Sequence, residues 1–493
     1  MKRISFRLIG LALLTPLVLG TAFDLLQPLA AQSEPAKTIE KPRNGGKSGQ
    51  GKGEVKMPTP AFRTEVPAHE YDLILGRPTK EAITLSVLTY GEREGYVAYG
   101  TKSGEYAKET PKQKFLKGQP VEMLINSLAP NTRYYYQFCS RAVGKGDFER
   151  SAEANFMTAR PPGSEFTFTV QADPHLDFAT DPDVYLRSLT NAIVSGTDFH
   201  IDLGDTFMTD KYTDYKAAAD QYLAQRYYFG VVGRFAPVYL VLGNHDGEAG
   251  WFLDGGRENS AVWSNEMRKR YYPNPLPNIF YTGNQVPDRQ AGLLENYYAW
   301  TWGDALFIAL DPFWYTRNKT RGDDNWNRTL GDAQYAWLKK TLENSTAKYR
   351  FVFLHHLVGG SSKEARGGVE AAKLFEWGGF SLNGQNEFAT KRPGWALPIH
   401  QLLVKHHVNV VFHGHDHLFV KQELDGVIYQ EVPQPGHPRG TTRSAEEYGY
   451  KSGVILPASG IMRIKVSSEN AVVQYLKTGK EMEVAHEYMV KGR

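Results

Sequence analysis

The chain has 493 residues, a formal net charge of +3 and a single cysteine. Its length suggests two or three domains, and its hydrophobic content of 41% is enough to form sizeable cores. The near-neutral charge balance gives no argument for binding to nucleic acid or to an acidic membrane, and a lone cysteine excludes an intramolecular disulfide.

Residues 1–33 have the pattern of a secretory signal peptide. Three basic residues come before or at the start of an apolar run from Leu8 to Leu19, and small-residue cleavage patterns follow at residues 20–22 and 31–33. An uncleaved membrane anchor is the alternative, but the run is shorter than the approximately 20 residues that a membrane span needs. We therefore expect cleavage, no stable membrane span afterwards, and a secreted, periplasmic or cell-envelope protein.

Residues 34–63 are rich in Lys, Gly, Pro and Ser and poor in side chains that a core would bury. The stretch from Lys41 to Gly53 alone contains four basic residues and five glycines. This composition predicts a disordered linker. A basic patch that contacts an anionic envelope surface is the alternative.

Residues 64–160 alternate apolar and polar side chains in short runs that predict β-strands. The clearest runs occupy residues 83–88, 121–125 and 134–138. Residues 128–134 carry the motif Leu-x-Pro-x-Thr-x-Tyr, which resembles the turn and corner tyrosine of fibronectin type III and other Ig-like sandwiches. We expect an all-β sandwich with a structural role; binding of a cell-surface ligand is the alternative. Cys139 lies on the last of these strands and is expected to be an inert core thiol.

Five polar motifs come next, and each directly follows a short apolar run. The motifs are Asp173-Pro-His175, Gly204-Asp205, Gly243-Asn-His-Asp246, His355-His356 and Gly414-His-Asp-His417. The apolar runs before them lie at residues 166–170, 199–203, 238–242, 351–354 and 408–412. Such runs predict buried β-strands, and neighbouring strands of an α/β fold place their site residues at one edge of a sheet. Side chains far apart in the sequence are therefore expected to converge there.

The residue types in these motifs are those that bind metal ions. Carboxylate, amide and imidazole groups without a thiolate suit Mn, Fe or Zn. Seven such donors are too many for one tetrahedral ion and suit two ions that share a bridging carboxylate. Two divalent cations offset by two Asp carboxylates leave a surplus of about +2, which suits a phosphate dianion. Taken singly, each motif is also explained as an ordinary turn, cap or surface group. Only the five motifs together indicate a metal site.

Read in order, the motifs resemble those of the calcineurin-like metallophosphoesterase superfamily over roughly residues 164–480. The resemblance implies an α/β four-layer domain, in which two packed β-sheets are flanked by helices. It implies that Asp173, His175 and His417 hold one metal ion, that Asn244, His355 and His415 hold the other, and that Asp205 bridges both. His355 is preferred to His356 as a ligand because it comes directly after the strand.

The same resemblance implies that His245 contacts the phosphoryl group and assists the leaving oxygen. Asp246 then orients His245, or is only a helix-cap carboxylate. A β-sandwich ahead of such a domain is the layout of purple acid phosphatases. Those enzymes have a tyrosinate ligand where this chain has Met208, and a non-ligand where it has His175. We therefore expect the general site of the superfamily, without an obligatory ferric ion.

The segments between the motifs predict helices and long loops. Helices are predicted to begin at Asp181-Pro-Asp183 and to span Asp214 to Arg226 and Asp332 to Asn344. Residues 247–300 resemble the variable insertion that borders these sites, residues 317–328 are expected to be exposed, and residues 358–397 form a second long loop near the metals. On that loop, Lys363, Arg366 and Trp377 either contact substrate or are solvated. Residues 427–429 and 463–466 are expected to be strands of the second sheet.

The expected function is an exported hydrolase of phosphate monoesters that uses two divalent metal ions (Mn, Fe or Zn). A hydroxide held between the ions attacks phosphorus in line, and the substrate is a small phosphate ester; the motifs give no sign of nucleic-acid binding or of oligomeric state. A phosphodiesterase of the same mechanism and a surface-binding protein with a mainly structural metal domain are the alternatives. Because all seven ligand positions and His245 are present, an enzyme is favoured.

Overall fold

The computed structural model describes residues 62–319 and 322–493. The predicted signal peptide at residues 1–33 and all but the last two residues of the predicted linker lie outside the described residues. Within the described ranges, no helix combines the length and the apolar character needed to cross a membrane.

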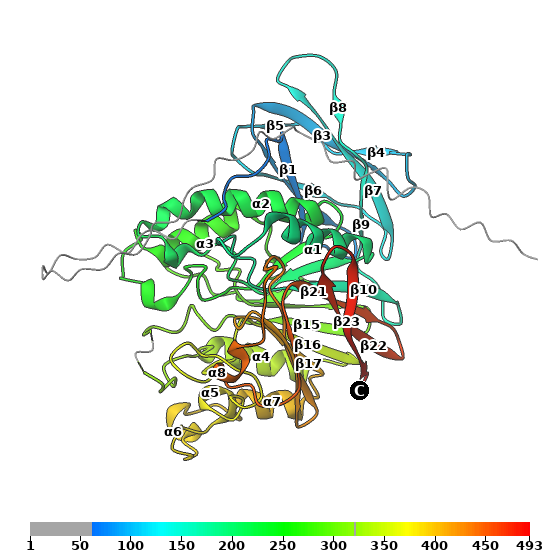
Figure 1. Cartoon of the computed structure of the whole chain (residues 1–493). Coiled ribbons are helices and arrows are strands. Elements are labelled where there is room, and N and C mark those ends of the chain that lie inside the picture. Colours follow the sequence, from blue (N-terminus) through cyan, green and yellow to red (C-terminus); the bar gives the residue numbers. More distant parts are fainter. Residues whose placement is uncertain (1–61, 320–321) are drawn as a thin grey trace, which may run out of the picture. The chain divides into compact units, whose positions relative to one another are not determined.

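Two antiparallel sheets form the strand-rich N-terminal region (Figure 1). The three-stranded sheet consists of β1 (Tyr71–Gly76), β2 (Ile83–Thr89) and β6 (Val121–Ile125). The six-stranded sheet consists of β3 (Arg93–Gly100), β4 (Lys108–Glu109), β5 (Gln113–Phe115), β7 (Arg133–Ala142), β8 (Glu149–Arg150) and β9 (Ala154–Met157). Side chains from both sheets share one apolar core, which includes Leu85 of β2 and Phe138 of β7. This is the sandwich that the period-two alternation predicted.

Tyr134 forms the predicted corner of the sandwich. Its hydroxyl accepts a hydrogen bond from the backbone N–H of Ala129 at 2.8 Å, five residues upstream. The ring of Tyr134 stacks on that of Phe156 in the core, with centroids 5.6 Å apart. Cys139 is fully buried, and burial raises the pKa of its thiol, as expected for an inert core residue.

The rest of the described chain contains two larger sheets. The first has the strand order β12-β11-β10-β21-β22-β23. Its strands are β10 (Phe166–Gln171), β11 (Phe199–Asp202), β12 (Val238–Leu240), β21 (Gly460–Val466), β22 (Asn470–Thr478) and β23 (Met482–Lys491). β10, β11 and β12 are parallel, so they end at the same edge of the sheet. β23 extends this sheet beyond residue 480, the predicted end of the domain.

The second sheet has the order β13-β14-β15-β16-β17-β19-β18-β20. Its strands are β13 (Thr282–Gly283), β14 (Tyr298–Trp302), β15 (Ala305–Ala309), β16 (Tyr349–Phe353), β17 (Val410–His413), β18 (Leu418–Leu424), β19 (Val427–Glu431) and β20 (Val454–Pro457). β15, β16, β17 and β19 are parallel. The prediction that residues 427–429 and 463–466 share one sheet is wrong, because β21 pairs with β10 in the first sheet.

Helices cover the outer faces of both sheets (Figure 1). α1 (Pro182–Val194) and α2 (Ala219–Gly233) pack on the first sheet, and α4 (Asp332–Glu343), α5 (Phe375–Gly378) and α7 (Ile399–Lys405) pack on the second. The other helical segments are η2 (Thr209–Lys211), η3 (Tyr215–Ala218), η4 (Gly250–Phe252), α3 (Ser260–Tyr271), α6 (Phe388–Lys391) and α8 (Ser444–Glu447). Asp181 caps α1 by accepting the N–H groups of Asp183 and Val184, as predicted. The four-layer α/β architecture is therefore confirmed.

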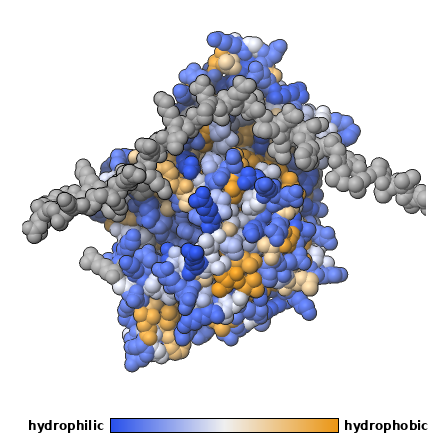
Figure 2. Space-filling view, viewed as in Figure 1, coloured by the Kyte–Doolittle hydropathy of each residue, from blue (hydrophilic) through white to orange (hydrophobic). Residues whose placement is uncertain are grey.

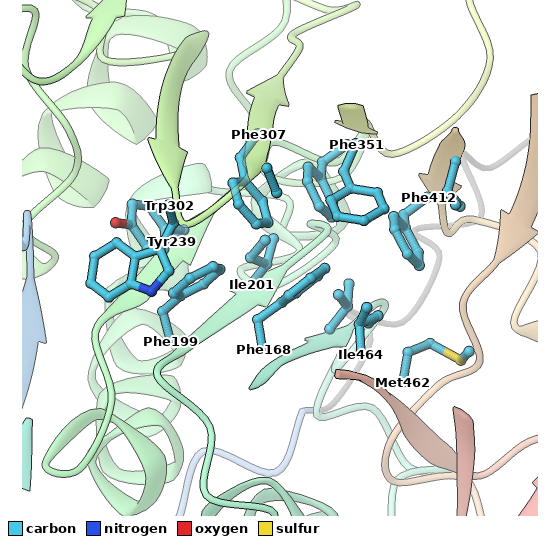
Figure 3. Close-up of a cluster of buried hydrophobic side chains, with 14 of the residues drawn as sticks. Phe168, Phe199, Ile201, Tyr239, Trp302, Phe307, Phe351, Phe412, Met462 and Ile464 are labelled. Atoms are coloured by element: carbon cyan, nitrogen blue, oxygen red, sulfur yellow. The ribbon is translucent and has the colours of Figure 1, made fainter. Parts of the chain in front are cut away.

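Aromatic side chains fill the space between the two packed sheets (Figure 3). Phe168 of β10 is fully buried, and its ring meets that of Phe307 of β15 edge to face with centroids 5.1 Å apart. Phe353 and Phe412 stack at 5.2 Å within the second sheet. Such pairs contribute about 0.5–1.5 kcal/mol beyond the burial of their area. In contrast, the face of the molecule in Figure 2 is largely hydrophilic, with hydrophobic residues in separate areas.

Arg226 of α2 ties the sandwich to the helical layer. Its guanidinium is fully buried and donates to the Ser86 carbonyl at 3.0 Å and to the Ser86 hydroxyl at 3.1 Å. It also donates to the carbonyl of Tyr271. One side chain therefore joins β2, α2 and the end of α3 through hydrogen bonds that are protected from water.

Candidate metal centre

The predicted metal-binding side chains follow the strands of both sheets at one edge. Asp173, Asp205 and Asn244 come after β10, β11 and β12 of the first sheet. His355 comes after β16, and the Gly414–His417 turn comes after β17, both in the second sheet. The convergence expected from the sequence therefore occurs where two packed sheets end together.

The first cluster contains Asp173, His175 and His417, whose candidate ligand atoms all lie within 4.8 Å of one another. Oδ1 of Asp173 is 3.5 Å from Nε2 of His175 and 3.4 Å from Nε2 of His417. The side chain of Asp173 is fully buried, whereas 36% of the His417 side chain is exposed. His417 is therefore on the solvent side of this cluster.

The second cluster contains Asp205, His355 and His415. Nε2 of His355 lies 3.3 Å from Oδ2 of Asp205 and 3.2 Å from Nδ1 of His415. Oδ2 of Asp205 also lies 3.7 Å from Nε2 of His175, which belongs to the first cluster. Asp205 therefore stands between the two clusters, in the position that a bridging carboxylate requires.

Hydrogen bonds set the tautomers of two of these imidazoles. Nδ1–H of His355 donates to the carbonyl of Leu203 at 2.9 Å, which directs Nε2 toward Asp205 and His415. Nε2–H of His415 donates to the carbonyl of Glu364 at 2.7 Å, which leaves its Nδ1 lone pair facing His355. Backbone acceptors of this kind commonly orient metal-binding histidines.

Three buried polar atoms near these clusters have no hydrogen-bond partner among the described residues. They are Oδ1 of Asp173, Nε2 of His175 and Oδ1 of Asn244. Buried polar atoms are almost always paired, so unpaired ones require an explanation. Each is a carboxylate, imidazole or amide donor that fits a divalent cation, and the residues present therefore fit a metal centre.

His356 is occupied elsewhere, in contrast to His355. Nδ1–H of His356 donates to the carbonyl of Leu357 at 2.9 Å, and its Nε2 accepts from Arg328 at 3.2 Å. Both ring nitrogens of His356 are therefore engaged, while Nε2 of His355 lies in the second cluster.

The carboxylates in the two clusters favour the presence of positive charge. Burial acts to raise the pKa of Asp173 and of Asp205, but the neighbouring imidazoles outweigh it and hold both pKa values well below the ordinary range. Burial acts to lower the pKa of His355, but the carboxylates of Asp205 and Asp173 outweigh it and raise this pKa to about 9. The two carboxylates thus stabilise any cation placed between them.

His245 lies beside the bridging position, with Nε2 3.9 Å from Oδ2 of Asp205 and 19% of its side chain exposed. The prediction that Asp246 orients His245 is wrong. Nδ1 of His245 pairs instead with Oδ1 of Asp210 at 2.8 Å. Asp210 is on η2, five positions after Asp205, and no sequence motif marked it.

Asp246 organises the backbone around the bridging carboxylate. It accepts hydrogen bonds from the N–H groups of Gly243 at 2.7 Å and of Asp205 at 3.1 Å. It also accepts those of Thr206 and Phe207, both at 2.8 Å. This carboxylate joins the loops after β11 and β12 and positions their backbone. Its role is therefore similar to the alternative in which Asp246 is a capping carboxylate.

The backbone at the clusters is held in an unusual conformation. Asp173, Asp205, His415 and His417 have φ angles of 58°, 55°, 83° and 61°, in the left-handed region that non-glycine residues seldom adopt. Such strain persists only where the surrounding structure imposes it and is concentrated at functional sites. The neighbouring glycines permit the close approach, because a Cβ on Gly243 would lie 2.3 Å from Oδ1 of Asp205.

Residues 317–319 and 322–328, the described part of the segment predicted to be exposed, are only partly exposed. Asn325 and Arg328 are buried; Nδ2 of Asn325 donates to the carbonyls of Gly359 and Ser362, and Nη2 of Arg328 donates to that of Lys363 at 2.8 Å. These polar side chains anchor the loop after β16. Trp377 is fully buried and donates to the hydroxyl of Tyr429, so it contacts neither substrate nor solvent.

Fold and site together define a four-layer α/β protein with two clusters of metal-binding residue types at the edge where its two sheets end. A model of the calcineurin-like phosphoesterase family matches residues 166–419, more than half of the chain, and the chain belongs to this family. The family uses a dinuclear metal centre, and this protein is a metal-dependent phosphatase or phosphoesterase. No curated protein matches it in sequence.

Two solved structures share the fold. PhoD has a TM-score of 0.60 and 14% identity, over 85% of this chain and 90% of PhoD. Purple acid phosphatase PPD1 from yellow lupin (Lupinus luteus) seeds has a TM-score of 0.58 and 16% identity, over 85% of this chain and 74% of that protein. Each likeness covers 85% of the chain, whereas residues 164–493 make up about 67% of it, so both likenesses extend into the residues before 164.

Proposed function

We propose that this protein is an exported hydrolase of phosphate monoesters. The observation that carries the proposal is the pair of clusters joined at Asp205, with His245 beside them. Two divalent ions and two carboxylates leave a surplus of about +2, which matches a phosphate dianion better than the single charge of a diester. Export is supported by the signal pattern of residues 1–33.

The side chains of the site have separate roles in metal binding and in proton transfer. Asp173, His175 and His417 would hold one divalent ion, Asn244, His355 and His415 would hold the other, and Asp205 would be shared between them. When bound, the ions supply a strong nucleophile at neutral pH and neutralise the phosphoryl oxygens. His245 holds a proton at Nε2 for the leaving oxygen, and Asp210 stabilises its imidazolium form.

The test is hydrolysis of p-nitrophenyl phosphate and bis-p-nitrophenyl phosphate by metal-stripped protein, with Mn, Fe(II) or Zn added back. We expect metal-dependent turnover that favours the monoester and is lost in His245→Ala. Preference for the diester would replace the proposal with a phosphodiesterase. Two bound ions without turnover of either ester would indicate a surface-binding protein.

Export is tested separately by sequencing the N-terminus of the mature protein purified from its host. An N-terminus after residue 22 or after residue 33 agrees with signal cleavage. A mature chain that begins at Met1 in the cytosol contradicts the export part of the proposal and leaves the enzymatic part untouched.

A further inference from the structure

A small hairpin lies directly on the second cluster. Ser361 and Arg366 exchange backbone hydrogen bonds, from Ser361 N–H at 2.7 Å and from Arg366 N–H at 2.8 Å, and so close the 361–366 hairpin. Within it, the carbonyl of Glu364 accepts the Nε2–H of His415. Buried Arg328 and Asn325 donate hydrogen bonds to backbone carbonyls of the same hairpin, at Lys363 and Ser362. The hairpin is therefore a fixed wall of the metal centre.

Arg366 projects from this hairpin and is held in one orientation. Its Nη1 donates to the carbonyl of His415 at 2.9 Å and to Oδ1 of Asp416 at 2.8 Å. Its guanidinium carbon lies 4.2 Å from the centre of the Tyr448 ring. Asp416 is itself fixed by the N–H of Gly367 at 2.8 Å and by the hydroxyl of Tyr450, also at 2.8 Å. The side chain is thus pre-organised beside a metal-binding residue.

Among the described residues, only Nη1 of this guanidinium has a hydrogen-bond acceptor. Neither Nε nor Nη2 of Arg366 has an acceptor in the described part of the chain, and 21% of the side chain is exposed. The edge that carries Nε and Nη2 is one of the two edges with which arginine binds a carboxylate or phosphate in a bidentate manner. Buried Arg226, by contrast, directs both terminal nitrogens at protein acceptors.

We propose that Arg366 determines specificity by binding a second anionic group of the substrate, so that the preferred substrates are phosphate esters that carry a carboxylate or a further phosphate. The inference rests on the proposed phosphoesterase function and names its substrate class. The metal-binding side chains would hold the scissile phosphoryl group through their ions, and the edge of Arg366 that carries Nε and Nη2 remains for a second anionic group beside His415. Asp416 keeps the guanidinium in place without using that edge.

The first experiment compares 3-phosphoglycerate with glycerol 3-phosphate, two esters of similar size of which only the first carries a carboxylate. The metal-loaded, full-length protein is expected to prefer 3-phosphoglycerate. In Arg366→Gln, the ratio of the two kcat/KM values should fall about tenfold, mainly through KM. Arg366→Lys should keep part of the preference because it retains the charge but loses the planar fork.

Lys363→Gln is the matched control, because Lys363 is an exposed cation on the same hairpin. It should leave the ratio within about twofold of the wild type, since an unfixed surface charge contributes little. If Lys363→Gln lowers the ratio as much as Arg366→Gln, the preference is a general charge effect and the proposal is overturned. It is also overturned if Arg366→Gln lowers kcat/KM equally for both esters.

A binding measurement does not depend on turnover. Calorimetry with 2-carboxyethylphosphonate, 1,2-ethylenediphosphonate and propylphosphonate should show that the wild type, but not Arg366→Gln, binds the two compounds with a second anionic group more tightly than propylphosphonate. The better of the two identifies carboxylate or phosphate as the second group. Equal affinity for all three compounds in the wild type contradicts the role of Arg366. Absence of turnover with these preferences intact would instead contradict the proposed function alone.

Discussion

Oδ1 of Asp210 lies 2.8 Å from Nδ1 of His245, and this contact joins the segment after β11 to the loop after β12. Both side chains are mostly shielded from water, with 7% and 19% exposed. The carboxylate therefore sets the ring orientation of His245, the residue proposed to assist the leaving oxygen, a role that the motif itself assigned to Asp246.

Asp210→Asn should lower kcat by about 10- to 100-fold, because the amide neither stabilises the imidazolium nor favours the required tautomer. Metal content, measured by plasma mass spectrometry, should stay at the wild-type level. The matched control is Asp220→Asn, an exposed carboxylate on α2, which should keep full activity. Loss of metal in Asp210→Asn would contradict a role exerted through His245.

Asp246→Ala should weaken metal binding and stability, in contrast to Asp210→Asn, which should lower kcat and keep the metal. It leaves four backbone N–H groups without their acceptor, on the loops that carry Asp205 and Asn244. We expect metal affinity to fall at least about tenfold and the free energy of unfolding to fall by about 2–4 kcal/mol. Calorimetric metal titration and thermal unfolding measure the two effects. A variant that binds both ions normally yet turns over slowly would restore the orienting role of Asp246.

Gly414→Ala should remove metal without changing a ligand. A Cβ at this position would lie 2.6 Å from Cβ of Ala172 and 2.8 Å from Oδ2 of Asp173, both closer than real Cβ contacts allow. The first cluster must then shift, and metal-dependent turnover should fall by about 10²-fold or more. Gly91→Ala, where a Cβ meets nothing within 4 Å, should behave as the wild type. Normal metal binding by Gly414→Ala would show that this close approach is dispensable.

Glu295 should make stability depend on pH. Burial raises the pKa of this carboxyl from 4.5 to about 7, with Arg268 offsetting it only in part, and its Oε2 has no hydrogen-bond partner among the described residues. As pH rises, the unfolded state loses this proton first, so the free energy of unfolding falls between about pH 4.5 and pH 7 and is level above.

Glu295→Gln removes this titration and should therefore gain about 2–3 kcal/mol over the wild type at pH 8 and little at pH 4.5. Urea unfolding at the two pH values measures the difference. The exposed Glu165→Gln is the control and should show the same small effect at both. A gain that does not depend on pH would mean that burial does not raise the pKa of the Glu295 carboxyl.

Much of the fold was predictable because strands and helix starts depend on local sequence patterns, such as apolar runs and capping residues. The runs before the motifs became β10, β11, β12, β16 and β17 within a few residues, and Asp181 capped α1. The aromatic stretch after Asp246 has no period, so α3 was not predicted within it. β21 was assigned to the wrong sheet, because sheet membership depends on pairing with β10, some 300 residues away, which no local pattern encodes.

By itself, the sequence determined which donors follow which strands, and hence the chemistry of the site, because ligands at strand ends are positioned by local backbone periodicity. Only the tertiary structure decided which groups support those donors. Asp210 reaches His245, Arg366 reaches His415 and Arg328 reaches His356 across loops that have no repeating pattern. Partners of this kind are selected by distance and burial after the two sheets have packed, and both are properties of the folded chain.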